Sequence, residues 1–317
     1  MLRLDDRVRI GMMFPGGERA ESLRYATRAE AAGLDSLWVG DHVAFHVPIP
    51  DAFSVLAFLA AATERVQLGT AVYLLPLRPP VQVAKAAAAV DRLSNGRLVF
   101  GVGVGGEYPP EFEASGVAVG ERGARTDEAI PLLRRLWREE RVAHDGRFFR
   151  FSPLTLAPRP VQAGGPPIWI GGRAPAAMRR AGRLGDGYVS TMMSPERYRS
   201  NLERIALEAR AAGRDARPFA TAALLFAAID RSYELALERA AALLGRLYAR
   251  PFRDAAAKYC LLGRPEDCLA GIRRFVDAGV RHVILAPLGD PGELLDIVAT
   301  RLVEPVQALA PSPPSGA

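Results

Sequence analysis

Short apolar runs recur along the chain, and each run is followed by a turn and then by a segment with helical spacing. Eight of these runs stand out, at residues 8–14, 35–40, 66–72, 98–103, 167–171, 187–190, 219–229 and 282–286. Strands with nearly continuous apolar sequence are typical of a parallel sheet that helices cover. Eight strand–helix repeats therefore predict an α/β fold in the form of a (β/α)8 TIM barrel, with a doubly wound sheet as the alternative.

The segments between the apolar runs have the one-sided pattern of surface helices. In one of them the apolar stripe consists of Leu132, Leu133, Leu136 and Trp137. Arginines occupy the other side of the same segment, as expected for a helix that packs one face against a sheet. Gly33 and Gly279 stand just after two other segments, where a glycine commonly ends a helix.

Three intervals are too long for simple connections between strands and helices. Residues 104–119 predict a long loop after strand four, and residues 250–263 predict an insertion after strand seven. The phenylalanine- and proline-rich residues 142–165 predict a hairpin and an extended run before strand five. We expect one barrel domain over residues 1–310 and a disordered tail over residues 311–317, which are rich in proline and serine.

Composition narrows the classes of function. The net charge is +6, but carboxylates balance the arginines and no dense basic block lies beside aromatic residues, so we expect no nucleic-acid partner. No window of 18 uninterrupted apolar residues is present, which argues against a membrane span. The first residues lack the order of a secretory signal, and Cys260 and Cys268 have no further ligand residue nearby. We therefore expect reduced thiols, no bound metal and a cytoplasmic location.

The glycine-rich stretch that follows strand four is the first candidate for ligand binding. Gly101, Gly103 and Gly106 match G-x-G-x-x-G, which binds dinucleotides when a helix opens at its last glycine. Pro109 and Pro110 follow, so we expect the loop to continue before any helix starts, and this context disfavours a dinucleotide site. A glycine-rich turn without a ligand is a second alternative. We favour a ligand loop at the carboxyl end of a barrel strand, where glycines let a ligand approach the backbone.

Proton carriers are expected at the same end of the barrel, because the functional residues of TIM barrels collect at the carboxyl ends of the strands. Asp41 and His42 follow strand two, and Glu107 lies in the loop after strand four. Since a histidine titrates near neutral pH, His42 and Glu107 are candidate acid–base residues. The alternative is structural: an Asp-His pair often anchors a loop, and a loop glutamate is often solvated.

A candidate phosphate site follows strand five. Gly171, Gly172 and Arg173 precede Pro175, which is well placed in the first turn of a helix. Free backbone N–H groups and the positive end of a helix dipole favour an anion there, and Arg173 adds charge. An ordinary tight turn with a solvated arginine is the alternative.

Taken together, several motifs resemble the bacterial luciferase-like flavin or deazaflavin oxidoreductases. The resemblance spans residues 8 to about 305. It rests on residues 37–42, 66–72, 93–105, 122–123, 168–172, 263–267 and 278–283. Each motif is weak by itself, but the ordered set is specific.

The resemblance implies that FMN or coenzyme F420 binds in the mouth of the barrel, with hydride transfer at its ring. Asp41-His42 is similar to the F420-dependent branch, in which His42 and Glu107 would be the catalytic, proton-handling residues. The resemblance also implies a non-proline cis peptide between Ala71 and Val72. The residues expected to bind the cofactor are Asp41, Thr70, Ala71, Val72, Gly103, Gly105, Gly106, Gly171, Gly172 and Arg173.

The family resemblance therefore predicts an oxidoreductase that transfers a hydride between coenzyme F420 and a small organic substrate. Two alternatives stay open: an FMN-dependent monooxygenase that uses O₂ and a separate flavin reductase, and a flavin-binding barrel without turnover. Members of this family are often homodimers, so a homodimer is expected. The pocket above the ring is expected to have an aromatic lining that includes Phe14, Phe45, Tyr73 and Tyr108.

Overall fold

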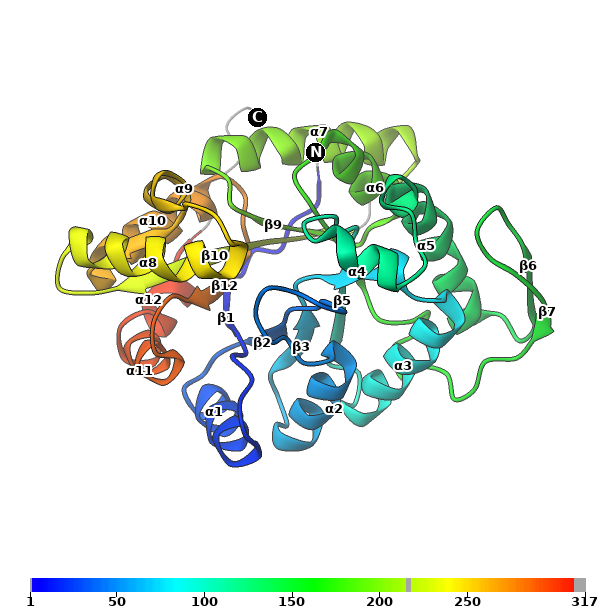
Figure 1. Ribbon diagram of the computed structural model, residues 1–317, viewed down its shortest axis with the longest axis horizontal. Helices are drawn as coiled ribbons and strands as arrows, with labels where there is room; N and C mark the ends of the chain where they lie inside the picture. Colours follow the sequence, from blue (N-terminus) through cyan, green and yellow to red (C-terminus); the bar gives the residue numbers. More distant parts are fainter. Residues whose placement is uncertain (1, 215–217, 311–317) are drawn as a thin grey trace.

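In residues 2–214 and 218–310, which the computed structural model describes, eight parallel strands form a closed barrel (Figure 1). They are β1 (Arg9–Met13), β2 (Ser36–Val39), β3 (Gln67–Thr70), β5 (Leu98–Gly103), β8 (Ile168–Gly171), β9 (Gly187–Thr191), β10 (Ala220–Ile229) and β12 (His282–Pro287). Neighbouring strands pair in chain order, and β12 pairs with both β10 and β1, which closes the ring. The predicted (β/α)8 barrel is confirmed.

Helices surround the barrel (Figure 1). They are α1 (Arg19–Ala31), α2 (Ala52–Ala62), α3 (Pro80–Leu93), α5 (Arg122–Arg138), α6 (Pro175–Leu184), α7 (Pro195–Ala211), α8 (Tyr233–Tyr248), α10 (Pro265–Asp277), α11 (Pro291–Arg301) and the short α12 (Val303–Gln307). Local sequence sets their ends, because Ser194 and Ser232 accept hydrogen bonds from the first turns of α7 and α8. Gly33 and Gly279 have positive φ angles just beyond α1 and α10, as predicted.

The connection after β5 contains a helix that begins earlier than the sequence predicts. Helix α4 (Pro109–Ala114) starts at the first of two prolines, so the expected longer loop before any helix is wrong. Proline is favourable at the first helical positions, because its φ angle suits a helix and its missing N–H would have no partner there. The dinucleotide-binding alternative still fails, because β5 belongs to a closed barrel and not to a doubly wound sheet.

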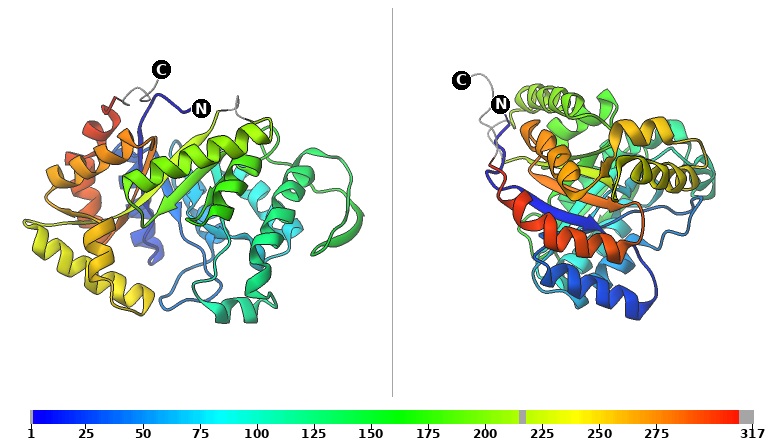
Figure 2. Two further views of the ribbon diagram at one scale, coloured as in Figure 1. Left: turned by 90° about the horizontal axis from the view of Figure 1, so that it is seen from above. Right: turned by 90° about the vertical axis from the view of Figure 1, so that its left-hand side faces the viewer.

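The other two insertions have regular structure. Strands β6 (Val142–Asp145) and β7 (Arg150–Leu154) form the predicted hairpin, which projects from the barrel in two views (Figures 1 and 2). Helix α9 (Arg253–Tyr259) and strand β11 (Leu261–Gly263) lengthen the seventh repeat, and β11 pairs with the end of β10. The predicted disordered tail, residues 311–317, lies outside the described residues.

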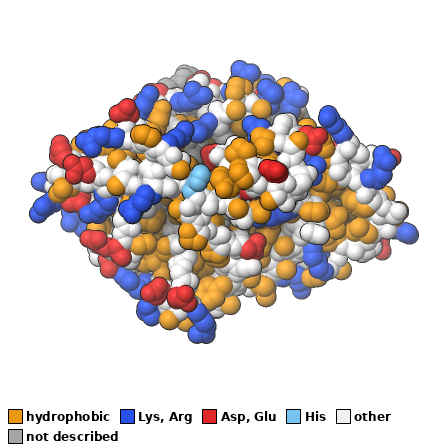
Figure 3. All heavy atoms as spheres, viewed as in Figure 1, with side chains coloured by type: hydrophobic (Ala, Val, Ile, Leu, Met, Phe, Trp, Pro, Cys, Tyr) orange, Lys and Arg blue, Asp and Glu red, His pale blue; other side chains and the backbone are white. Residues whose placement is uncertain are grey.

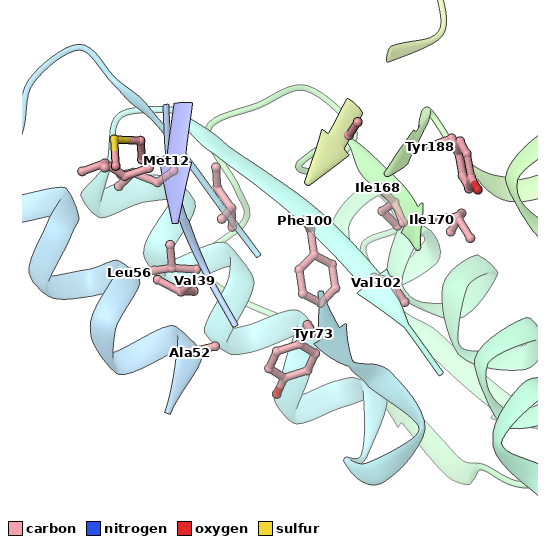
Figure 4. Close-up of a cluster of buried hydrophobic side chains, with 14 of the residues drawn as sticks. Met12, Val39, Ala52, Leu56, Tyr73, Phe100, Val102, Ile168, Ile170 and Tyr188 are labelled. Carbon is pink, nitrogen blue, oxygen red and sulfur yellow. The ribbon is translucent and has the colours of Figure 1, made fainter. Parts of the chain in front are cut away.

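Most of the core lies between the outer face of the barrel and the helices. Figure 4 shows part of this layer, including Phe100 of β5, Ile170 of β8 and Leu56 of α2. All three side chains are fully buried. Burying such a side chain stabilises the fold by roughly 2 kcal/mol relative to exposure. The predicted stripe on α5 belongs to this layer, since its members are all buried: Leu132, Leu133, Leu136 and Trp137.

The barrel interior is packed around two tryptophans. The rings of Trp38 and Trp169 lie 5.2 Å apart, centroid to centroid. A Cβ at Gly69 would lie 2.3 Å from the Trp38 ring, so only a glycine leaves enough room on β3. The interior below the mouth is therefore a packed core and not a channel.

Charges on the surface are mixed in sign. Figure 3 shows Lys and Arg interspersed with Asp and Glu around the visible face, without a field of one sign. Within the described ranges, every helix is too short or too polar to cross a membrane.

A buried histidine lies at the amino end of the last barrel strand. The Trp38 indole N–H donates to Ser36 Oγ at 2.7 Å, which leaves the Ser36 hydroxyl free to donate to His282 Nε2 at 2.6 Å. Burial lowers the pKa of His282 from 6.5 to about 3. His282 is therefore a neutral structural residue.

Replacing His282 by asparagine should remove part of the acid sensitivity of folding. The unfolded histidine takes up a proton near pH 6.5, while the folded one stays neutral because its pKa is about 3. The stability that this group contributes is complete above about pH 6.5 and falls as the pH drops, by about 2 kcal/mol between about pH 7 and about pH 5. Urea unfolding at both pH values should show that additional loss in wild type and not in His282→Asn. Equal losses would contradict the assignment.

Candidate active site

Asp41 joins two connections at the mouth of the barrel. Its carboxylate is buried and accepts two hydrogen bonds from the Arg78 guanidinium, at 2.6 and 2.8 Å. It also accepts the Leu74 backbone N–H at 2.8 Å. Burial raises the pKa of Asp41, and the Arg78 guanidinium counteracts that rise. Both oxygens are thus occupied by the protein, which makes Asp41 a brace between the connections after β2 and β3.

The floor of the mouth follows β3. Thr70 is fully buried, and its hydroxyl donates to the Gly101 carbonyl at 2.6 Å. The peptide between Ala71 and Val72 is cis, as the resemblance predicts, and the short strand β4 (Tyr73–Leu74) then pairs with β5.

Two of the predicted cofactor glycines leave room for a protein side chain. A Cβ at Gly103 would lie 2.3 Å from a methyl group of Val72, and one at Gly171 would lie 2.7 Å from its other methyl group. These distances are far inside ordinary contact, so Val72 fits into the mouth only because both positions lack side chains. The glycine pattern in the sequence predicts close approach by a ligand but does not reveal this packing requirement.

The catalytic candidate His42 contacts a glutamate that the sequence analysis did not select. His42 Nδ1 lies 3.1 Å from both carboxylate oxygens of Glu111, and the Val43 backbone N–H donates to Glu111 Oε2 at 3.1 Å. The Glu111 side chain is fully buried, while 14% of the His42 side chain is exposed. The mouth therefore contains a buried carboxylate–imidazole pair.

Helix α4 brings Glu111 to this place. Two prolines start the helix, so Glu111 falls in its first turn. The next residue, Phe112, is fully buried in a cluster with Leu74 and Leu77, which fixes the helix against the floor of the mouth. A signal in the sequence was available, because a glutamate just after two prolines precedes a buried aromatic residue.

Glu107, the second catalytic candidate, lies elsewhere on the rim. It is exposed, and among the described residues none forms a hydrogen bond or ion pair with it. Its carboxylate faces Tyr248 closely enough to add to the effect of burial, which raises the pKa of Tyr248 to about 12. Glu107 and His42 are thus not in contact. The buried partner of His42 is Glu111, which lies further along the chain in α4.

Aromatic side chains cover the histidine. Phe45 stacks on His42 with ring centroids 4.0 Å apart, and Tyr108 and Tyr248 pack edge-on against Phe45 at 6.0 and 6.3 Å. Phe45 and Tyr108 therefore lie beside His42, and their place in a substrate pocket stays a prediction.

The two other aromatic residues predicted to line the pocket belong to the core. Phe14 is buried and packs on Tyr25, and Tyr73 is buried between Phe53 and Phe100. Both side chains belong to the main hydrophobic core, so the structure contradicts their place in the lining.

The connection after β8 holds the candidate phosphate site. Gly172 has φ +129°, and its carbonyl accepts the Tyr188 hydroxyl at 2.8 Å. Arg173 is exposed beside it, and Pro175 begins α6 as predicted. A Cβ at Gly172 would lie 2.9 Å from the Cβ of Ala177. The backbone conformation and the packing therefore both require a glycine here, whether or not a phosphate binds.

The glycines after β5 have positive φ angles. Gly105 has φ +61° and Gly106 has φ +109°. A Cβ added at Gly106 would lie 3.0 Å from Nε of the Arg122 side chain. These glycines are needed for the turn that leads into α4.

Unpartnered polar atoms gather near this end of the barrel. In the described part of the chain, the buried side-chain atoms without a hydrogen-bond partner are Arg122 Nε, Ser190 Oγ and Thr191 Oγ1. Ser190 and Thr191 end β9, next to the strand that carries Gly171. Successive side chains of a strand point to opposite faces, and Val189, two positions before Thr191, belongs to the cluster inside the barrel. Buried polar groups normally have partners, so the Thr191 hydroxyl, which lies on this inner face, indicates a polar ligand or water in the mouth. Neither Ser190 nor Thr191 was predicted from the sequence, although both lie at the carboxyl end of an apolar strand.

A metal site is not evident. The described residues contain no group of three or more His, Cys, Asp or Glu side chains arranged to hold an ion.

The barrel and its mouth correspond to a known family. The model of the luciferase-like monooxygenase family matches residues 8–304. The chain therefore belongs to the luciferase-like monooxygenase family, which confirms the resemblance seen in the sequence.

Relatives within this family use different cofactors. The chain is 31% identical over 299 residues to the F420-dependent glucose-6-phosphate dehydrogenase of Amycolatopsis mediterranei, covering 83% of this chain and 86% of the relative. A stretch of 158 residues is 36% identical to the oxygenase component of the flavin-dependent trigonelline monooxygenase of Acinetobacter baylyi, covering 49% of this chain and 43% of that protein.

A solved structure supports the fold. An F420-dependent secondary alcohol dehydrogenase in complex with an F420–acetone adduct superposes with a TM-score of 0.85 at 24% identity. The match covers 95% of this chain and 99% of that one.

Removing Arg78, the partner of Asp41, should destabilise the folded protein. Arg78→Met leaves a buried carboxylate unpaired, which should lower the free energy of unfolding by about 3–5 kcal/mol. Arg135→Met is a matched control, because Arg135 pairs with Glu139 on the surface and exposed pairs contribute about 1 kcal/mol or less. Urea unfolding at neutral pH measures both. A loss below about 1 kcal/mol for Arg78→Met would contradict the role of Asp41 as a brace.

Proposed function

We propose that this protein is an oxidoreductase that transfers a hydride between coenzyme F420 and a small organic substrate. The observation that carries the proposal is His42, held by the buried Glu111 in the mouth of a luciferase-like barrel. The similarity to an F420-dependent dehydrogenase over 83% of this chain supports F420 as the cofactor.

The residues at the mouth fit such a cofactor. Thr191 offers an unpartnered hydroxyl, and Gly172 and Arg173 offer a backbone turn and a positive charge before α6. A helix N-terminus with an adjacent arginine suits the phosphate of a cofactor.

We propose the same cofactor-binding set as the sequence analysis, with different tasks for its members. Val72 would form the surface under the ring, while Asp41 and Thr70 would support the floor from within the protein. The glycines would supply the space around them. They are Gly103, Gly105, Gly106, Gly171 and Gly172.

The chemistry divides between cofactor and protein. F420 supplies the acceptor or donor of a hydride when it is bound. His42 takes up or releases the proton that balances the hydride, since histidine exchanges protons near neutral pH. Glu107 remains a second proton carrier at the rim, in contact with solvent and near Tyr248.

An FMN-dependent monooxygenase with a separate reductase is the second candidate. The similarity of 158 residues to a flavin-dependent oxygenase component favours it. A barrel that binds a flavin without turnover is a third possibility. We also propose a homodimer located in the cytoplasm, as expected from the sequence.

The test of function compares cofactors and then removes the histidine. Purified protein should bind F420 more tightly than FMN, and a His42→Ala variant should slow single-turnover hydride transfer by about 10²–10⁴-fold without loss of cofactor affinity. Glu107→Gln should have a smaller effect because Glu107 is exposed. Tight binding of FMN, with substrate oxidation only in the presence of O₂ and a reductase, would establish the second candidate. A wild-type rate in His42→Ala would defeat the role of the histidine.

Arg173 should contribute to binding of the cofactor phosphate. Arg173→Ala removes a charge-assisted contact worth about 1.5–3 kcal/mol, so F420 affinity should fall by roughly 10- to 100-fold. Arg179→Ala is the control, because Arg179 is exposed on the same helix beyond its first turn. Titration of cofactor binding measures both. Gly172→Ala is a poor test, since its φ angle and the contact with Ala177 would disturb the turn itself. Unchanged affinity in Arg173→Ala would place the phosphate elsewhere.

A further inference from the structure

The turn after β8 is held from behind by a tyrosine of the next strand. The Tyr188 hydroxyl donates to the Gly172 carbonyl at 2.8 Å. Val189, the next residue of β9, belongs to the cluster inside the barrel, so Tyr188 faces outwards, towards the helices. Figure 4 labels it there together with Ile170, its register partner in β8. The Gly172 carbonyl therefore points towards the outer core layer.

A residue of α7 sets the direction of this hydroxyl. The side-chain amide nitrogen of Asn201 lies 3.0 Å from the Tyr188 oxygen. Since a carbonyl oxygen only accepts, Tyr188 donates its proton to Gly172 and accepts from the NH₂ group of Asn201. Burial raises the pKa of Tyr188 to about 12, so the hydroxyl is a donor at neutral pH. The two hydrogen bonds form a directional chain from α7 to the turn, in which each bond polarises the other.

A fixed carbonyl also fixes the N–H group of the same peptide. The peptide between Gly172 and Arg173 is trans, and the C=O and N–H of a planar trans peptide point in opposite directions. The Arg173 N–H therefore points away from the outer layer, towards the mouth. Among the described residues, none accepts a hydrogen bond from this N–H. It is available to an acceptor from outside the chain.

We propose that Tyr188 is the positioning residue of the turn after β8: through the Gly172 carbonyl it aims the Arg173 N–H at the cofactor phosphate. Asn201 holds the hydroxyl for this task. The inference rests on the proposed function, which puts the phosphate at this turn. Gly172 has no side chain that would restrict its peptide, so a hydrogen bond from outside the turn sets the direction. A donor that is already aimed binds an anion without a further cost of ordering.

A purely structural tyrosine would have different consequences. The same hydrogen bonds tie the turn to β9 and α7. Such a tie would change the stability of the fold and the affinity for every ligand of the mouth alike, whereas a positioning role concerns the phosphate alone. Two ligands that differ only in a phosphate group therefore separate the roles.

The variant Tyr188→Phe removes the hydroxyl and keeps the ring. Its affinity for a ribityl deazaflavin 5′-phosphate should fall by about 5- to 10-fold, because one hydrogen bond that orients the phosphate donor is lost. Its affinity for the same deazaflavin without the phosphate should stay within about twofold of wild type. Equal falls for the two ligands in a binding titration would overturn the proposal.

A double-mutant cycle tests the chain from α7. Asn201→Ala alone should lower affinity for the phosphorylated ligand by about two- to fivefold. Added to Tyr188→Phe, it should cause no further fall, because Asn201 acts through the Tyr188 hydroxyl. An equal fall in both backgrounds would overturn this part of the proposal.

Tyr198 provides a matched control. It is fully buried, and its hydroxyl donates to the Ala222 carbonyl at 3.2 Å, within a barrel strand and not in a turn. Tyr198→Phe should therefore keep the wild-type preference for the phosphorylated ligand. A loss of preference as large as that of Tyr188→Phe would show a general effect of removing a buried hydroxyl, and would overturn the specific role.

A measurement on wild type tests the proposal even if Tyr188→Phe does not fold. Carbon-13 in the glycine carbonyls and nitrogen-15 in the arginines make the Gly172–Arg173 peptide observable by NMR. The amide proton of Arg173 should move downfield when the deazaflavin 5′-phosphate binds, since a phosphate is a strong acceptor. The same chemical shift with both ligands would overturn the proposal.

The proposed function and this inference can fail separately. If the protein binds flavins and not deazaflavins, F420 is the wrong cofactor, and FMN and riboflavin form the corresponding pair of ligands for testing Tyr188. If wild type shows no preference for the phosphorylated member of either pair, the phosphate does not bind at this turn and the inference is wrong.

Discussion

The bidentate pair of Asp41 and Arg78 is the interaction on which the geometry of the mouth depends. A carboxylate with no exposed surface requires a partner, and this one also binds the Leu74 backbone. The connections after β2 and β3 are therefore joined in one place. Because His42 is the next residue and Val72 lies in the joined segment, the candidate histidine and the floor of the mouth have a defined relation to each other.

The second buried carboxylate has a different physical character. Glu111 faces an imidazole, which can exchange a proton, whereas Asp41 faces a guanidinium, whose charge is permanent. The pair of Glu111 and His42 suits proton exchange, and the pair of Asp41 and Arg78 suits rigidity. Both carboxylates also bind a backbone N–H, so each fixes a loop at the carboxyl end of a strand.

The glycines of the mouth combine packing with access. Gly103 and Gly171 make room for Val72, while Gly105, Gly106 and Gly172 adopt positive φ angles. Their absence of side chains is needed by the protein itself, before any ligand is considered. Glycine-rich strand ends in a barrel can therefore mark close packing of the chain as well as a place where a ligand approaches.

The sequence by itself determined the strands, the helices and the barrel, because apolar periodicity and turn residues are local properties that set which faces are buried. It also placed Asp41 and His42 at a strand end. Only the tertiary structure decided between Glu107 and Glu111, since the contact with His42 joins residues 69 positions apart. That choice depends on where α4 starts and on how Phe112 packs, and both are settled by contacts with segments far away in the sequence.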